Sequence, residues 1–300
     1  MLEFYNCISA FRLKTLPLSL SGIILSSFIS YSEKGIFNVH IFIWSSLTSI
    51  FIQILSNLAN DYGDGIKGTD NRIGPKRTIQ SCMIYKKKMR IALIIFSVLS
   101  FISNIILLFS SFKEKNTYII VFLIIVILIC ILSAIKYTIG YHPYGYKGLG
   151  DLYVLIFFGL ISLEGNYYLY NNNLNIKLLL LCFSLGFLTV SVLNINNMRD
   201  IENDKKNKKY TIPVIIGLKK SKIYHILLMI VPFILSIIFV ILTYKSIYQY
   251  IFIILILPTI IHLNKIYKIN NHKYFNNELK KAVYINILYA LLMGIGFILK

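Results

Sequence analysis

Nine long apolar runs divide this chain of 300 residues. They cover roughly residues 16–32, 40–58, 91–112, 117–136, 151–170, 177–197, 222–243, 247–264 and 282–299. A helix of about 20 apolar residues crosses the hydrocarbon core of a bilayer, because it satisfies its backbone hydrogen bonds internally. The pattern therefore predicts an all-α integral membrane protein, a bundle of nine transmembrane helices, with the lipid bilayer as its surroundings.

The distribution of positive charge predicts how these helices are oriented. The net charge of +19 could by itself suggest nucleic acid, but the basic residues lie beside the apolar runs and form no nucleic-acid-binding module. With the N-terminus inside, the inner segments hold 25 of the 31 Lys and Arg residues. Such an excess is typical of cytoplasmic loops. We expect a multi-pass protein of the cytoplasmic (inner) membrane with its N-terminus inside, and no nucleic-acid partner.

Two short acidic stretches lie at the ends of apolar runs. They cover residues 57–64 and 194–204, and they contain five of the 12 Asp and Glu residues of the chain. Carboxylates at the boundary of a membrane-embedded bundle are costly to place and therefore suggest function. The alternative is that they are helix-end carboxylates paired with nearby Lys and Arg.

The spacing within each stretch places oxygen ligands on one face of a helix. Positions three and four apart are neighbours on a helix, which groups Asn57 with Asp61 and Asp64. The same spacing groups Asn196 with Asp200 and Asp204. Mg²⁺ binds a few carboxylates together with the oxygens of a substrate phosphate. These six residues are therefore predicted Mg²⁺ ligands, and the two clusters could hold one diphosphate between them.

Several motifs resemble one family. Asn60-Asp61-x-x-Asp64 with Asp200-x-x-x-Asp204 resembles the paired aspartate motifs of the UbiA superfamily of intramembrane prenyltransferases. Its menaquinone-pathway branch is similar to this chain at Arg12–Pro17, Gln53–Asp64, Lys67–Asp70, Arg72–Pro75, Pro143–Asp151 and Leu193–Asp200. Gly68 stands where the wider superfamily has a third aspartate, an arrangement that the menaquinone branch shares.

The resemblance implies a reaction and a set of roles. The expected activity is transfer of a polyprenyl group from polyprenyl diphosphate to 1,4-dihydroxy-2-naphthoate, with loss of CO₂ and with Mg²⁺ as cofactor. The whole chain, 1–300, is then a single transmembrane prenyltransferase domain whose cavity faces the cytoplasm. The expected catalytic residues are Asp61, Asp64, Asp200 and Asp204; the diphosphate-binding residues are Lys67, Arg72, Asn60, Asn197 and Arg199.

The loop between the fourth and fifth runs is dense in Tyr, Gly and Pro. An aromatic belt at the membrane interface would explain this composition. The functional interpretation is a wall of the cavity for the aromatic acceptor, formed by Lys136, Tyr137, Tyr146 and Asp151.

Three alternative functions are compatible with the sequence. The first is a related prenyltransferase acting on 4-hydroxybenzoate or a tetrapyrrole. The second is a transporter, although transport sites usually lie near the membrane midplane and not at one face. The third is a lipid-binding membrane protein without activity, against which the intact acidic motifs argue.

Overall fold

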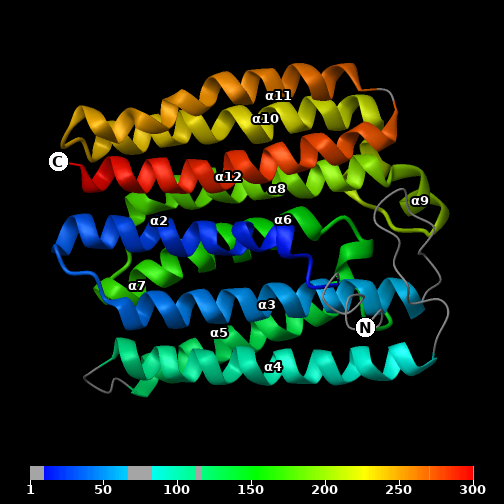
Figure 1. Ribbon diagram of the computed structural model, residues 1–300, viewed down its shortest axis with the longest axis horizontal. Coiled ribbons are helices and arrows are strands. Elements are labelled where there is room, and N and C mark those ends of the chain that lie inside the picture. The colour runs from blue at the N-terminus through cyan, green and yellow to red at the C-terminus, as the bar shows by residue number, and fades with distance from the viewer. Residues whose placement is uncertain (1–9, 67–82, 113–116, 270, 300) are drawn as a thin grey trace.

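The computed structural model describes residues 10–66, 83–112, 117–269 and 271–299 (Figure 1). All regular elements in these ranges are helical, and nine helical segments are long and apolar enough to cross a membrane. The predicted all-α architecture with nine spans is thereby confirmed.

The α-helices follow in chain order as α2 (Leu16–Lys34), α3 (Val39–Ile66), α4 (Met83–Ser111), α5 (Thr117–Lys136), α6 (Gly150–Val154), α7 (Asn166–Asn171), α8 (Leu179–Arg199), α9 (Ile201–Lys206), α10 (Ile212–Leu242), α11 (Ile256–Lys268) and α12 (Phe275–Ile298). A π-helical segment, Leu155–Gly165, joins α6 to α7, so that these three pieces form one span. A 3₁₀ segment, Ile247–Leu255, leads into α11 in the same way.

Several helices are longer than the apolar runs that predicted them. α3 continues to Ile66, beyond the boundary near 58 that its run gave. α10 begins at Ile212, before the boundary near 222 that its run gave, and Gly217, with φ 79° and ψ 160°, breaks the helical backbone between these two positions. Polar side chains at a membrane boundary do not interrupt the helical backbone, and Pro213 in the first turn of α10 favours a helix start there. The first acidic stretch consequently lies inside α3 and not in a loop.

The long helices lie side by side along the long axis of the molecule (Figure 1). α8 is the most enclosed of them: 72% of its most apolar stretch is buried, compared with 22% for α5. Close approach to α8 is possible at Gly159 in the π-helical segment, because a Cβ there would lie 2.5 Å from the carbonyl oxygen of Cys182. Small residues at such contacts allow helices to pack closely in a membrane.

Hydrogen bonds between buried side chains connect the central helices. Ser21 of α2 donates to Asn286 of α12 at 2.7 Å, and Asn286 donates in turn to Thr189 of α8 at 3.0 Å. These bonds are formed where water is absent, so breaking one would leave a polar group unsatisfied. They fix how α2, α8 and α12 lie relative to one another.

A chain of titratable side chains connects α10, α11 and α12. The two Nε2 atoms of His225 and His262 lie 3.0 Å apart, and His262 Nδ1 lies 2.8 Å from Glu278 Oε2. Lys281 donates to the other carboxylate oxygen of Glu278 at 2.6 Å. Each of the four side chains therefore has at least one partner, although Nδ1 of His225 is buried with no hydrogen-bond partner among the described residues. The arrangement accounts for Glu278, an acidic residue outside the two acidic stretches.

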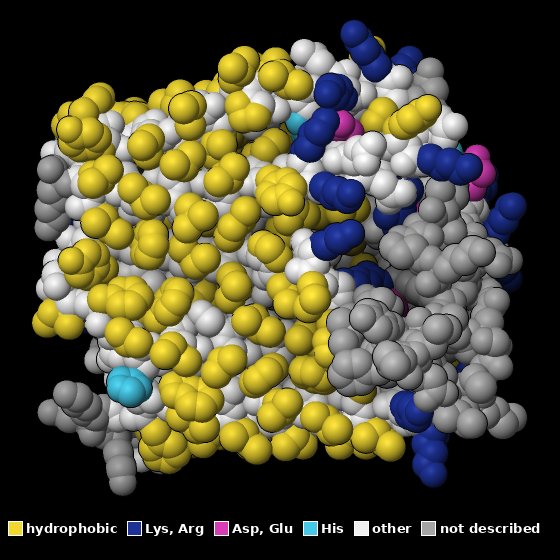
Figure 2. Space-filling view, viewed as in Figure 1, with side chains coloured by type: hydrophobic (Ala, Val, Ile, Leu, Met, Phe, Trp, Pro, Cys, Tyr) yellow, Lys and Arg dark blue, Asp and Glu magenta, His cyan; other side chains and the backbone are white. Residues whose placement is uncertain are grey.

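The outer surface separates an apolar region from a basic end (Figure 2). Hydrophobic side chains cover most of the visible face, and strongly exposed examples include Phe109, Phe122, Ile254 and Leu257. Lys and Arg side chains gather at the end where α3 and α8 terminate. An apolar surface this extensive would be unstable in water and is suited to lipid.

Candidate active site

The two acidic stretches lie at the same end of the bundle. The last turns of α3 carry the first stretch, and the end of α8 together with α9 carries the second (Figure 1). Asp61, Asp64, Asp200 and Asp204 are 5%, 0%, 2% and 2% exposed, respectively. A buried carboxylate needs compensating donors or cations, so the groups around each aspartate define what the site can do.

Donors from two distant segments surround the first stretch. Arg12 Nη2 lies 2.5 Å from Asp61 Oδ1, and Asn57 donates to the carbonyl oxygen of Phe11 at 3.0 Å. Tyr146 donates its hydroxyl hydrogen to Asp64 at 2.8 Å. The predicted helical face is therefore present, with Asn57, Asp61 and Asp64 all buried along α3.

A close contact fixes the end of α3 against the Tyr- and Gly-rich loop. Thr138 donates to the carbonyl oxygen of Ala59 at 2.8 Å. A Cβ on Gly63 would lie 2.8 Å from the Cβ of the same threonine, so only glycine allows the two segments to approach this closely. The loop is thereby placed beside Asp64.

The second stretch has a break in its helix. Asp200 ends α8 and precedes α9, with φ −98° and ψ 9°. Hydrogen bonds four residues apart nevertheless continue through the break, from Asp200 N to Asn196 O at 3.2 Å and from Asp204 N to Asp200 O at 2.8 Å. The predicted spacing of one helical turn between these three residues is retained.

Arg199 holds this second stretch through four hydrogen bonds. Its guanidinium binds both oxygens of Asp200, at 2.9 Å through Nε and 2.7 Å through Nη2. It also donates to Asn196 at 2.7 Å and to Asn276 of α12 at 2.8 Å. A bidentate pair of this kind fixes the carboxylate in orientation as well as in charge. The orientation of Asp200 is thus fixed by the adjacent Arg199, which α12 in turn holds through Asn276.

Tyr146 connects the two acidic stretches. Its hydroxyl binds Asp64 of the first stretch, and its ring lies 5.5 Å from the ammonium of Lys209. Lys209 lies 4.0 Å from Asp204 of the second stretch. The carbonyl oxygen of Tyr146 also accepts from the backbone N–H of Tyr210 at 3.0 Å. Side chains that are far apart in the sequence therefore meet around one aromatic residue.

The rest of the loop is organised by stacked tyrosines. Tyr144 stacks on Tyr153 with ring centroids 3.8 Å apart and meets Tyr137 edge to face at 5.3 Å. Burial raises the pKa of the Tyr144 phenol above its ordinary value, so the group stays protonated and donates to Ser133 O at 2.8 Å. Because of these contacts the loop is packed on one side of the site; we call this packed loop the wall.

A small pocket, too narrow in this structure to admit a water molecule, lies between this wall and the second stretch. Its lining includes Tyr137, Asp151 and Asn197 together with Thr211. Asp151 accepts a hydrogen bond from Tyr224 of α10 at 3.0 Å. The structure therefore brings two of the predicted acceptor residues beside one of the predicted diphosphate residues.

The remaining predicted residues are placed differently. Lys136 is the last residue of α5, is exposed and does not line the small pocket. The side-chain oxygen of Asn60 is buried and has no hydrogen-bond partner among the described residues. Lys67 and Arg72 lie outside the described residues.

Three residues that lie near the site were not predicted from the sequence to be part of it. Arg12 was noted only as part of a motif, and Lys209 and Tyr224 were not singled out. The motif containing Arg12 was a signal that could have identified it. Lys209 lies within a run of lysines, so nothing in the sequence distinguished it from its neighbours.

The donor set fits Mg²⁺ bound together with a diphosphate. Each stretch supplies two buried carboxylates, and Asn60 offers an oxygen without a partner among the described residues. No group of three His, Cys, Asp or Glu side chains in the described ranges could hold a metal ion by itself. Mg²⁺ usually keeps several waters and binds through one or two carboxylates plus substrate phosphates, so two carboxylates per stretch are sufficient.

Known proteins resemble this chain in sequence over most of its length. The model of the UbiA prenyltransferase family matches residues 19–291. The 1,4-dihydroxy-2-naphthoate octaprenyltransferase of Haemophilus influenzae is 37% identical over 96% of this chain and 94% of its own length. The enzyme of the same name from Escherichia coli is 37% identical over 82% of this chain and 80% of its own.

Solved structures show the same fold at lower identity. A UbiA homologue from Aeropyrum pernix superposes with a TM-score of 0.66 at 14% identity, covering 94% of this chain and 96% of its own. A homologue from Archaeoglobus fulgidus bound to DMAPP and Mg²⁺ gives a TM-score of 0.59 at 15% identity, over 94% and 98% of the two chains. The chain belongs to the UbiA prenyltransferase family.

Proposed function

We propose that this protein transfers a polyprenyl group from polyprenyl diphosphate to 1,4-dihydroxy-2-naphthoate, releasing CO₂ and diphosphate and forming demethylmenaquinol, the hydroquinone form of demethylmenaquinone. The observation that carries the proposal is the 37% identity, over 96% of the chain, to a relative named for that activity. The buried aspartates of the two acidic stretches lie around Tyr146, which supports placing the reaction there.

The carboxylates of the two stretches are proposed to hold the diphosphate through metal ions. Asp61, Asp64, Asp200 and Asp204 would bind Mg²⁺ directly or through water, with Asn57 and Asn196 beside them. Bound there, Mg²⁺ would neutralise the charge that develops on the leaving diphosphate. An Archaeoglobus fulgidus homologue has been solved with DMAPP and Mg²⁺, which supports a divalent metal in this family.

Cationic and amide side chains are proposed to position the diphosphate oxygens. Lys67, Arg72, Asn60 and Asn197 would contact it as donors. Arg199 makes four hydrogen bonds to Asp200, Asn196 and Asn276, so it would act mainly by fixing the second stretch.

The chemistry then requires a site that excludes water. Breaking the allylic C–O bond sends its electron pair to the diphosphate and leaves an allylic cation. The aromatic carbon of the acceptor attacks this cation, and loss of the carboxyl group as CO₂ restores the aromatic ring. The wall formed by Tyr137, Tyr146 and Asp151 would hold the acceptor and keep water from the cation.

The orientation in the membrane is part of the proposal. The acidic end, with Asp64 and Asp200, would face the cytoplasm in the inner membrane, because basic residues gather at that end. Single cysteines replacing the exposed Lys206 and Lys245 in a cysteine-free background would test this in intact cells. An impermeant thiol reagent should label position 245 alone; labelling of position 206 from outside would reverse the orientation.

Competing acceptors would test the substrate. Purified protein with Mg²⁺ and octaprenyl diphosphate would be offered 1,4-dihydroxy-2-naphthoate and 4-hydroxybenzoate, each labelled in its carboxyl group. We expect labelled CO₂ from the naphthoate alone. A prenylated benzoate that retains its carboxyl label would instead place the enzyme among those that act on 4-hydroxybenzoate.

A further inference from the structure

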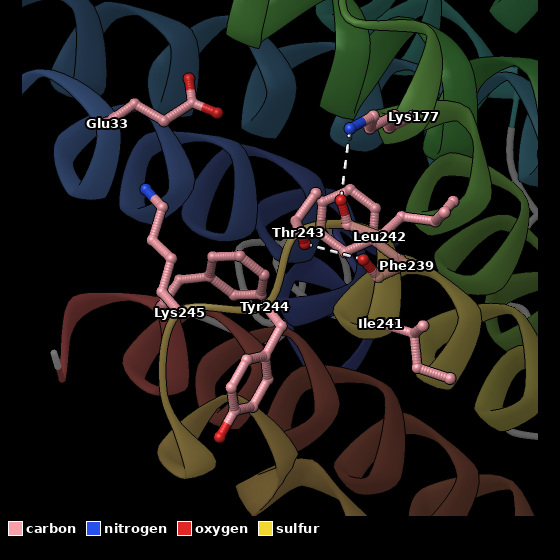
Figure 3. A pocket seen from close by; sticks show the side chains of 9 residues that line it. Glu33, Lys177, Phe239, Ile241, Leu242, Thr243, Tyr244 and Lys245 are labelled. Carbon is pink, nitrogen blue, oxygen red and sulfur yellow. Dashed lines mark hydrogen bonds between the residues drawn. The ribbon is translucent and has the colours of Figure 1, made fainter.

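A second pocket (Figure 3) is lined by the ends of helices at the end of the bundle opposite the acidic stretches (Figure 1). It has a volume of about 430 Å³ and lies where α2, α10 and α12 end, beside the start of α8. Neither the proposed reaction nor the family comparison assigns it a role. Side chains of both charge signs line it and face the same space.

Three charged side chains surround this pocket. The carboxylate of Glu33 is oriented by Tyr167, whose hydroxyl donates to Oε2 at 2.6 Å. Lys177 donates one hydrogen bond to the carbonyl oxygen of Leu242 at 3.2 Å, which leaves further N–H donors on its ammonium. Lys245 lies on the connection between α10 and the 3₁₀ segment Ile247–Leu255, and its side chain extends toward Glu33 (Figure 3). No salt bridge joins these three residues to each other or to another described side chain, so their charges remain available to a ligand.

The rest of the lining is apolar and continuous with the lipid-facing surface. The rings of Phe239 and Phe297 lie 5.5 Å apart at the base and are buried. Ile241 and Leu242 also line the pocket, yet they are strongly exposed on the outer surface. The pocket therefore has a charged rim, an apolar base and an apolar side that opens toward acyl chains.

We propose that this pocket binds the headgroup of a phospholipid that carries a primary ammonium, such as phosphatidylethanolamine. The phosphate would accept hydrogen bonds from Lys177 and Lys245, and the ammonium would donate to the carboxylate of Glu33. The acyl chains would lie along Ile241 and Leu242.

The sign of each charge selects this class of lipid over others. A purely anionic headgroup would satisfy the two lysines but would be repelled by Glu33. A choline headgroup carries a cation without N–H groups, so it cannot donate a hydrogen bond to the carboxylate. Only a headgroup with both a phosphate and an ammonium satisfies all three side chains. Such a lipid would join the ends of α2, α8 and α10.

Lipid binding to the purified, delipidated protein would test the proposal. Phosphatidylethanolamine, phosphatidylcholine and phosphatidylglycerol with identical acyl chains would be titrated in mixed micelles, with native mass spectrometry and thermal unfolding as readouts. In the wild type, phosphatidylethanolamine should bind about tenfold more tightly than phosphatidylcholine and raise the unfolding temperature the most. Equal binding of these two lipids by the wild type would overturn the proposal.

Matched variants separate the site from general lipid binding. Lys245→Ala should remove the tight binding, and Glu33→Gln should reduce the preference for phosphatidylethanolamine to the level of phosphatidylcholine. Lys34→Ala is the control, because Lys34 is adjacent to Glu33 but donates to Tyr170 O and does not line the pocket. Unchanged binding in Lys245→Ala, or a preference for phosphatidylglycerol in the wild type, would show that the charged rim does not select the headgroup. The readout is independent of prenyl transfer, so it does not depend on the proposed substrate.

Discussion

The two acidic stretches share a sequence pattern but differ in how the backbone presents it. Asn57 and Asp61 lie within the uninterrupted helix α3, whereas Asn196 and Asp200 lie at the junction of α8 and α9. In both cases a turn of helix separates the asparagine from the aspartate. The comparison shows that spacing of four residues preserves a common face even where one helix ends and another begins.

The stretches differ more in the origin of their counter-charges. Asp61 is paired with Arg12, which is 49 positions away, whereas Asp200 is paired with the adjacent Arg199. Arg199 is also the more buried arginine, with 8% of its side chain exposed against 28% for Arg12. The second stretch therefore contains the counter-charge of its own Asp200, whereas the counter-charge of Asp61 comes from the segment that precedes α2.

The largest effect should come from removing a carboxylate in each stretch. Changing Asp61 and Asp200 together to Ala should lower prenyl transfer about a thousandfold or more, because the leaving diphosphate would lose its charge stabilisation at both ends. Product formation by purified protein with Mg²⁺ measures this. Glu202→Gln is the matched control, since Glu202 belongs to the second stretch but its side chain is largely exposed. A double variant that works at the wild-type rate would refute the roles of both stretches.

The next largest effect should be on the stability of the protein, and it should differ between Arg199 and Arg12. Arg199→Ala would leave Asp200 buried without its bidentate partner, which should lower the free energy of unfolding by about 3 kcal/mol. Arg12→Ala should cost less, about 2 kcal/mol, because Arg12 is 28% exposed and water can replace part of its interaction with the buried Asp61. Thermal unfolding in detergent would compare the two.

A double variant identifies the cause of the difference. Arg199→Ala combined with Asp200→Asn removes both charges and should recover part of the lost stability, although not the activity. Equal unfolding temperatures for Arg12→Ala and Arg199→Ala would show that the two stretches do not differ in how they hold their aspartates.

Much of the fold could be predicted because lipid demands long apolar helices. Nine runs gave nine spans in the described ranges. Their ends were less predictable. α3 continues through polar residues to Ile66 because its backbone hydrogen bonds persist, whereas α10 starts with a short helical piece from Ile212 that a kink at Gly217 separates from the rest. Hydropathy records where a helix is apolar, not where it begins.

The candidate site was predictable only in part. The reason differs from the one that limited the prediction of helix ends. Helical spacing was enough to group Asp61 with Asp64. The bond from Tyr146 to Asp64 joins positions 82 apart, and the pair of Asp151 with Tyr224 joins positions 73 apart. Such partners depend on how the helices pack against one another, and the spacing of residues along one helix carries no information about that packing. Lys136 illustrates the converse, since it belongs to the correct loop by sequence but is exposed.

The smallest effect should come from the residue that connects the two stretches. Tyr146→Phe removes a hydrogen bond to Asp64 but keeps the aromatic ring beside Lys209. A lost hydrogen bond to a charged group is worth about 1.5 kcal/mol of stability, so the unfolding temperature should fall by a few degrees. Prenyl transfer should fall about tenfold, because Asp64 loses the group that orients it. Tyr141→Phe is the control, because Tyr141 is in the same loop and fully exposed. If Tyr146→Phe matched this control in both kcat and KM, the stretches would act without the connection through Tyr146. A fall in kcat alone would indicate that the hydroxyl orients Asp64 for the bond-breaking step, whereas a rise in KM alone would assign it to binding the diphosphate.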